Sequence, residues 1–154
     1  MDKVKIRTYK PSDKSKLMAI LRMNVPKYFA ETEIDDFDNY LDNETEQYFV
    51  IEFNDEIVGS GGINFEYSNK TGKLSWDIIN PHFQGKGLGT NLLKHRVDLL
   101  KAISEIEKIV VRTSQVAFRF YEKNGFVLQE TQKDYWAKGF DLYKMIYQGN
   151  NSIK

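Results

Sequence analysis

The first third of the chain changes from strand-like to helix-like periodicity. Apolar and polar residues alternate over 4–8, which predicts a half-buried strand. Apolar residues then recur at helical spacing over 17–21 and again over 34–41, which predicts a pair of short amphipathic helices. Ser12 or Asp13 is expected to cap the first helix, because a short polar side chain can accept a hydrogen bond from a free backbone amide.

The middle of the chain has the pattern of consecutive antiparallel strands. An apolar strand begins at Tyr48, Asn54-Asp55 supplies a tight turn, and a return strand begins at Ile57. A further strand covers 73–80, so these strands are expected to form a meander. Glycines inside the return strand allow a bulge or a close backbone approach. These glycines are Gly59, Gly61 and Gly62.

The last third of the chain alternates between helices and strands. A long amphipathic helix is expected over 88–103, followed by an apolar strand over 106–111 that should be buried on both faces. A helix over 114–124 begins at a serine cap and ends at an Asn-Gly pair. Strands over 126–130 and 140–146 complete the order strand, two helices, three strands, helix, strand, helix, two strands.

Composition fits one globular domain over 1–154. The chain has 154 residues, of which 41% are hydrophobic, enough to bury a core without disulfides or metal. Cysteine is absent, which excludes a thiol nucleophile and thiolate metal sites. His82 and His95 lack the spacing of a metal-ligand pair, so no metal site is expected. The residues 149–154 are expected to fray.

Charge and the N-terminal sequence bear on partners and location. Lys plus Arg and Asp plus Glu number 22 each, so no overall field recruits nucleic acid or an anionic membrane. The first residues are charged and contain no apolar h-region, so we expect neither a signal peptide nor a membrane anchor, and a cytoplasmic location. The sequence leaves open whether the protein is a monomer or a homodimer.

A glycine-rich stretch lies between the meander and the long helix. It reads Gln84-Gly85-Lys86-Gly87-Leu88-Gly89 and follows Pro81, which ends ladder pairing. The glycines keep side chains off a turn whose amides can point outward, and the next helix adds a partial positive charge at its N-terminus. This combination favours a phosphate group. Its spacing is neither that of a Walker A loop nor that of a Rossmann fingerprint.

The loop resembles the acyl-CoA signature of the GNAT superfamily of N-acyltransferases through Gln84-x-x-Gly87-x-Gly89 and the preceding Ile79-Asn80-Pro81. A second block, from Ser114 to Phe126, resembles the family segment in which a tyrosine, here Tyr121, lies near the CoA sulfur. The family often has asparagine where this chain has Ser114. The order of elements agrees with the resemblance, which implies an α/β (α+β) fold. We therefore expect a mixed, mostly antiparallel central sheet of about six to seven strands with helices on both faces.

The resemblance implies acetyl-CoA (coenzyme A) as the cofactor and direct transfer of its acetyl group to a primary amine in a ternary complex. The loop amides would take up the pyrophosphate, and the exposed strand edge past Ile79 could pair with the pantetheine amides. The candidate cofactor-binding residues are Ile79, Gln84, Gly85, Lys86, Gly87, Leu88, Gly89, Thr90, Ser114 and Tyr121.

Transfer to an amine requires proton chemistry. An amine with a pKa of roughly 10 arrives protonated and needs a base, whereas the leaving thiolate needs an acid. Tyr121 is the candidate acid, with a packed core aromatic as the alternative. Asp77 is the first candidate for the base, and Glu33, His82 or a water relay stay open. A backbone amide near Ile79 would hold the carbonyl oxygen as it gains charge.

The acceptor site is expected beside the two short helices. Its candidate residues are Tyr28, Phe29 and Glu33. Acids over 31–38 suggest a cationic acceptor such as a polyamine, an aminoglycoside or a lysine, and a solvated acidic helix is the alternative interpretation. A non-catalytic acyl-CoA-binding sensor or interaction module on the same fold is the main alternative function. A protein that binds ATP through the glycine loop is a further one.

Overall fold

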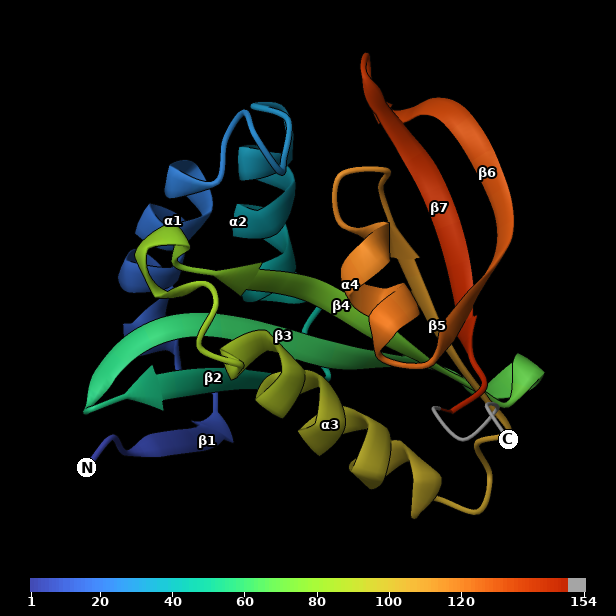
Figure 1. Cartoon of the computed structure of the whole chain (residues 1–154), viewed down its shortest axis with the longest axis horizontal. Coiled ribbons are helices and arrows are strands. Elements are labelled where there is room, and N and C mark those ends of the chain that lie inside the picture. Colours follow the sequence, from blue (N-terminus) through green and yellow to red (C-terminus); the bar gives the residue numbers. More distant parts are fainter. Residues whose placement is uncertain (150–154) are drawn as a thin grey trace.

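One sheet organises residues 1–149, the part of the chain that a computed structural model describes (Figure 1). Its strand order is β1-β2-β3-β4-β5-β7-β6, and neighbouring strands are antiparallel except for the parallel pair β4–β5. The strands are β1 (Val4–Thr8), β2 (Gln47–Phe53), β3 (Glu56–Glu66), β4 (Thr71–Ile79), β5 (Lys108–Thr113), β6 (Phe126–Ala137) and β7 (Phe140–Tyr147). The helices are α1 (Lys14–Met23), α2 (Glu33–Asn43), α3 (Leu88–Lys101) and α4 (Phe118–Lys123). Fraying was expected over 149–154, of which 150–154 lie outside the described residues.

Helices cover both faces of the sheet, α1 and α2 on one side and α3 and α4 on the other (Figure 1). Each side has its own cluster of buried apolar side chains. The α1/α2 cluster includes Leu17, Ile20, Leu21, Phe37, Val50 and Ile78. The α3/α4 cluster includes Ile51, Ile63, Leu92, Leu100, Val111 and Phe126. The predicted mixed, mostly antiparallel fold and the predicted order of elements are confirmed. Within residues 1–149, no helix is long and apolar enough to cross a membrane.

The hairpin between β2 and β3 forms at the predicted turn. Asn54 and Asp55 have φ angles of 50° and 69°. Positive φ at both central residues matches the twist of the flanking strands, and asparagine and aspartate tolerate it better than most residues do. The local sequence was therefore sufficient to predict this turn.

The C-terminal hairpin is longer than predicted. β6 continues to Ala137 instead of ending near Glu130. It is an edge strand that pairs with β7, and the side chains over 127–135 face solvent. The alternation of apolar and polar residues that normally reveals a strand is therefore missing from this part of the sequence.

Asp13 stands at the N-cap position of α1, but neither Asp13 nor Ser114 caps its predicted helix through its side chain, because each side chain has other partners. The Asp13 carboxylate accepts from both terminal nitrogens of Arg7, each at 2.9 Å, and from Lys10 N at 2.8 Å. A guanidinium is a stronger donor to a carboxylate than a neutral amide is. Ser114 Oγ accepts from Val116 N at 3.3 Å, and the helix that it was expected to cap begins only at Phe118.

The free energy of unfolding is expected to fall as the pH drops below about 4, partly because of Asp13. Hydrogen bonds from Arg7 lower the pKa of the Asp13 carboxyl group below its usual value. Its contribution is therefore complete above the pKa of the unfolded chain and is lost as the pH falls through the lower pKa of the folded state. Urea unfolding at pH 7 and pH 3 should show a smaller pH effect in Asp13→Asn.

The control for this measurement is Asp55→Asn, since Asp55 forms an exposed pair with Lys3. This variant should keep the pH dependence of the wild type, because exposed ion pairs contribute little to stability. A pH dependence in Asp13→Asn that equals that of the wild type would contradict the assignment.

Candidate active site

A cleft opens where β4 and β5 separate. The two strands pair only between Thr71–Leu74 and Lys108–Val111, after which they diverge (Figure 1). The cleft has a volume of about 940 Å³ and is lined by residues of both strands, the glycine loop, α4 and the segment before α2. This volume is in the range of small-molecule binding sites.

The end of β4 leaves a backbone amide free toward the cleft. Ile78 pairs with Ser60, and the N–H of Asn80 donates to Val58 O at 2.7 Å. Adjacent residues of an antiparallel strand turn their N–H groups to opposite sides. The N–H of Ile79 therefore points away from β3, to the side from which β5 has separated.

Asn24, which no sequence pattern singled out, holds the carbonyl group of the same residue. Its side-chain amide donates to Ile79 O at 3.2 Å and to Ile20 O at 2.9 Å. Asn24 is buried and lines the cleft. It ties the C-terminal end of α1 to the end of β4, a contact between segments far apart in the sequence.

The glycine loop places open backbone at the N-terminus of α3. Gly85 and Gly87 have φ angles of 83° and 77°, a region that favours glycine. A Cβ atom added to either would meet nothing within 4 Å in the described part of the chain. The amides from Leu88 to Thr90 precede the first intrahelical bond, from Asn91 N to Gly87 O at 3.0 Å. Such amides are available to an anion.

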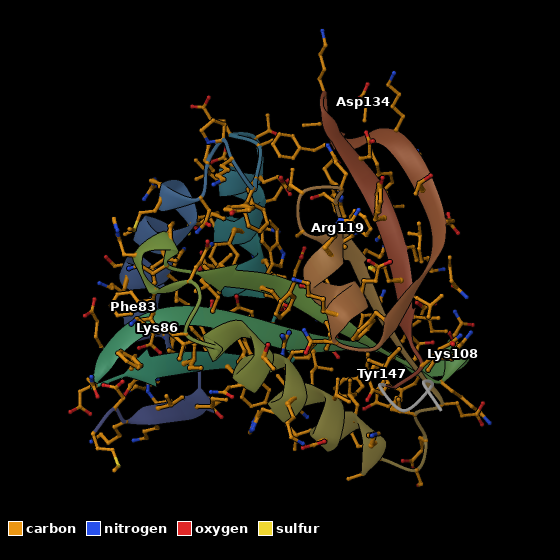
Figure 2. The ribbon with its side chains drawn as sticks, in the orientation of Figure 1. Phe83, Lys86, Lys108, Arg119, Asp134 and Tyr147 are labelled. Carbon is orange, nitrogen blue, oxygen red and sulfur yellow. The ribbon has the colours of Figure 1, made fainter. Side chains whose placement is uncertain are left out.

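The predicted loop residues line the cleft with the exception of Lys86. Its Nζ lies 5.5 Å from the centre of the Phe53 ring, and Figure 2 shows it beside Phe83 at the loop. Ser114 is buried and also lines the cleft. The structure thus brings most of the predicted cofactor-binding residues to one cavity, while the Lys86 side chain lies over the Phe53 ring.

A β-bulge in β4 determines which side chains face which side of the sheet. The register between β3 and β4 shifts between Ser60 and Gly62, so Trp76 and Asp77 together stand opposite Gly61. Trp76 has a φ of 50° and packs with the α1/α2 cluster. Asp77 faces α3 and α4 instead. The bulge therefore turns Asp77 toward the α3/α4 face of the sheet and Trp76 toward the α1/α2 face, and both residues line the cleft.

Asp77 lies between Arg96 and Tyr121. Its Oδ1 accepts from Arg96 Nη1 at 2.5 Å, and its Oδ2 accepts from the Tyr121 hydroxyl at 2.6 Å. These side chains come from β4, α3 and α4, and all of them line the cleft. The structure thus joins the predicted acid to the first candidate base and adds a buried arginine to them.

The environment keeps Tyr121 protonated at neutral pH. Burial raises the pKa of the Tyr121 hydroxyl well above its usual value, and the negative charge of Asp77 raises it further. The positive charge of Arg96 acts in the opposite direction. Tyr121 therefore carries a proton at the cleft. Its hydroxyl group is hydrogen-bonded to Asp77, which is itself paired with Arg96.

The predicted acceptor residues lie on the opposite wall of the cleft. Tyr28, Phe29 and Glu33 all line it. Phe29 stacks on Trp76 with ring centres 5.9 Å apart and an angle of 19° between the rings. Glu33 Oε2 accepts from Ala30 N at 2.8 Å, and burial raises the pKa of the Glu33 carboxyl group. A raised pKa makes a carboxylate a stronger base.

The other candidates for the base and for acceptor binding are placed differently. His82 is exposed and is not among the residues that line the cleft. Asp35 and Asp36 face solvent, and Asp38 pairs with Lys14. Most of the acids that suggested a cationic acceptor therefore form a solvated helix face. Glu33 is the member of that group that lines the cleft, together with the later residues Glu44 and Glu46.

Arg96 is the main site residue that sequence reasoning missed. It occupies a position on the apolar stripe of α3 that otherwise contains Leu92 and Leu100. An arginine among leucines signals a buried partner, because burying an unpaired guanidinium is unfavourable. That signal was present in the sequence, although it did not identify the partner.

A freed strand edge, a glycine turn and a helix N-terminus define a class of site that binds phosphate through backbone amides. The chain belongs to the acetyltransferase (GNAT) family, whose model matches residues 15–126. The resemblance noted in the sequence is thereby confirmed, together with the enzyme class, acetyltransferase, and acetyl-CoA as the cofactor of the family.

Similar proteins act on different amines. An N-alpha-acetyltransferase of Sulfurisphaera tokodaii is 25% identical over 158 residues, covering 92% of this chain and 90% of that protein. A spermidine N(1)-acetyltransferase of Escherichia coli K12 is 28% identical over 118 residues, covering 73% of this chain and 63% of that protein. The crystal structure of a spermidine N-acetyltransferase from Vibrio cholerae, in complex with CoA and spermine, matches with a TM-score of 0.72. It is 18% identical and covers 98% of each chain, a likeness that shows the fold.

Proposed function

We propose that this protein transfers an acetyl group from acetyl-CoA to a primary amine by direct attack in a ternary complex. The observation that carries the proposal is that the glycine loop, the free amide of Ile79 and the Tyr121 hydroxyl open on the same cleft. The opposite wall, with Tyr28 and Glu33, leaves room for an acceptor in that cleft. The relatives that are N-acetyltransferases support the same reaction class.

The residues present fit the cofactor. The backbone at Gly85 and Gly87 borders open space at a helix N-terminus, which suits a diphosphate. The outward N–H of Ile79 can donate to an amide carbonyl or to an oxygen that gains charge. Ser114 offers a hydroxyl from the β5 side of the cleft. Lys86 can add ionic attraction only if its side chain turns from Phe53.

The proton steps are assigned to side chains of both walls. Acetyl-CoA, when bound, would supply a thioester that an amine can attack at its carbonyl carbon, with the sulfur as the leaving group. Tyr121 holds a proton at its hydroxyl oxygen and, by rotation of the O–H bond, can turn it from Asp77 toward the cleft as a general acid. Asp77 already accepts from two donors, so its proposed role is to orient Tyr121. Because the amine arrives protonated, it first gives a proton to Glu33 or to a water relay, and only then can its nitrogen attack.

Acetyl-CoA is expected to bind with a micromolar-range dissociation constant, and thiol release should follow when a suitable amine is added. Isothermal titration calorimetry measures the first property, and a thiol-reactive chromophore measures the second over a panel of polyamines, aminoglycosides and peptide α-amines. ATP serves as the control ligand, because the glycine spacing of the loop is neither that of a Walker A loop nor that of a Rossmann fingerprint. The absence of acetyl-CoA binding up to millimolar concentration would contradict the proposal.

The same experiment tests the second candidate, a non-catalytic acyl-CoA sensor or interaction module. Binding without thiol release over the whole panel would favour that function, since the glycine loop would then serve binding alone. The cytoplasmic location, the arrangement as one domain and the choice between monomer and homodimer stay predictions.

A further inference from the structure

Arg96 is a charged side chain on the apolar face of α3. It is 1% exposed and lies among residues of the α3/α4 cluster. A buried guanidinium is costly unless it is paired and its N–H groups are bonded. The proposed reaction uses Tyr121 and Asp77 but assigns no role to Arg96.

The Arg96 guanidinium donates to two backbone carbonyl groups as well as to Asp77. Its Nε donates to Leu92 O at 3.2 Å, and its Nη1 donates to Gly62 O at 3.0 Å. The same Nη1 donates to Asp77 Oδ1 at 2.5 Å. Arg96 is therefore held by α3 and by β3, and its position determines how the Asp77 carboxylate is turned toward Tyr121.

The backbone at Gly61 leaves room for the contact between Asp77 and Arg96. A Cβ atom on Gly61 would lie 2.6 Å from Asp77 Oδ1 and 2.9 Å from Arg96 Nη1, so a side chain at this position would displace the pair. The bulge opposite Gly61 is also what turns Asp77 to this side of the sheet. Both features serve the contact between Asp77 and Arg96.

We propose that Arg96 is a positioning residue for Tyr121, an inference that rests on the proposed acetyl transfer. By binding one oxygen of Asp77 and offsetting its charge, Arg96 fixes the carboxylate that orients the Tyr121 hydroxyl. It also weakens the hold of that carboxylate on the hydroxyl hydrogen, so the hydrogen can turn toward the cleft. Without Arg96, the half-buried Asp77 carboxylate would hold the hydroxyl hydrogen more strongly.

The pKa of Tyr121 supports this arrangement. Burial raises it, the charge of Asp77 raises it further, and the charge of Arg96 opposes the rise. Arg96 therefore makes loss of the proton from Tyr121 less unfavourable than it would be beside Asp77 alone.

Arg96→Met is expected to lower kcat about tenfold to 100-fold and to leave the KM for acetyl-CoA unchanged. Arg96→Lys should regain part of the loss, because it restores the charge without the forked geometry. The matched control is Lys94→Met, which removes an exposed cation from the same helix. It should keep the kcat of the wild type. A wild-type kcat in Arg96→Met would overturn the proposal.

The Tyr121→Phe background separates positioning from stability. If Arg96 acts through Tyr121, then Arg96→Met should cause little further loss of kcat once the hydroxyl is gone. Losses that multiply would mean that Arg96 has a structural role only, and would overturn the proposal. If Arg96→Met does not fold, Gly61→Ala replaces it in the same cycle, since it displaces the pair without removing either charge.

A measurement without substrate keeps this inference distinct from the proposed function. The NMR shift of the Tyr121 ring carbon that bears the oxygen, assigned by its loss in Tyr121→Phe, reports the hydrogen bond to Asp77. It should move in Arg96→Met and stay unchanged in Lys94→Met. An unchanged shift in Arg96→Met would overturn the coupling. A moved shift in a protein that releases no thiol would refute the acetyl transfer and leave the coupling in place.

Discussion

Replacing Tyr121 by phenylalanine is expected to lower kcat about 100-fold while the affinity for acetyl-CoA stays unchanged. The ring remains and can keep its contacts with Phe120 and Phe126, whose ring centres lie 5.1 Å and 5.7 Å away. What is lost is the proton at the cleft and the hydrogen bond to Asp77 at 2.6 Å. Steady-state thiol release gives kcat, and calorimetry gives the affinity.

Tyr147→Phe is the matched control for this variant. Tyr147 packs on Phe126 in the same part of the core, with ring centres 5.2 Å apart, but does not line the cleft. It should keep the kcat of the wild type. An unchanged kcat in Tyr121→Phe would remove Tyr121 as the acid and would leave it as a core aromatic. A loss of acetyl-CoA affinity in parallel with kcat would instead assign the hydroxyl to cofactor binding.

Replacing Gly87 by valine is expected to weaken acetyl-CoA binding at least about tenfold. Gly87 has a φ of 77°, a conformation that costs a β-branched residue about 1–3 kcal/mol. In addition, a side chain would occupy the open space beside the loop amides, which is where a diphosphate would bind. The strain lowers the stability of the folded loop, whereas the added side chain blocks the space where the diphosphate would bind, so calorimetric affinity is the quantity to measure.

Gly139→Val provides the control for backbone strain. Gly139 lies in the turn between β6 and β7 and has a φ of 86°, and a Cβ atom added to it would likewise meet nothing within 4 Å among residues 1–149. The variant therefore imposes similar strain without touching the loop. It should lose stability and keep its affinity for acetyl-CoA. Equal affinities in Gly87→Val and the wild type would refute close backbone contact with the cofactor.

The sequence was most informative where one short segment decides its own conformation. Asn54-Asp55 predicted a hairpin turn, and both residues have the positive φ that this turn requires. The spacing of Gly85, Gly87 and Gly89 identified the loop that opens on the cleft. These features depend on backbone preferences of neighbouring residues, so they can be predicted without tertiary contacts.

Predictions failed where a distant partner or solvent exposure decided the outcome. Asp13 was expected to cap a helix, but Arg7 of another element takes its carboxylate. β6 extends past Glu130 because pairing with β7 holds an exposed polar segment in a strand. In each case the competing interaction lies outside the segment from which the prediction was made.

The sequence by itself determined the order of elements, the meander and the phosphate-type loop, because periodicity and glycine placement are local properties of the chain. The contact of Arg96 with Asp77 and Tyr121 was decided only by the tertiary structure. It joins α3, β4 and α4, and it depends on a bulge opposite Gly61 that reverses the side to which Asp77 points. A bulge changes the phase of every later side chain in its strand, and no spacing within the segment reveals where that change occurs.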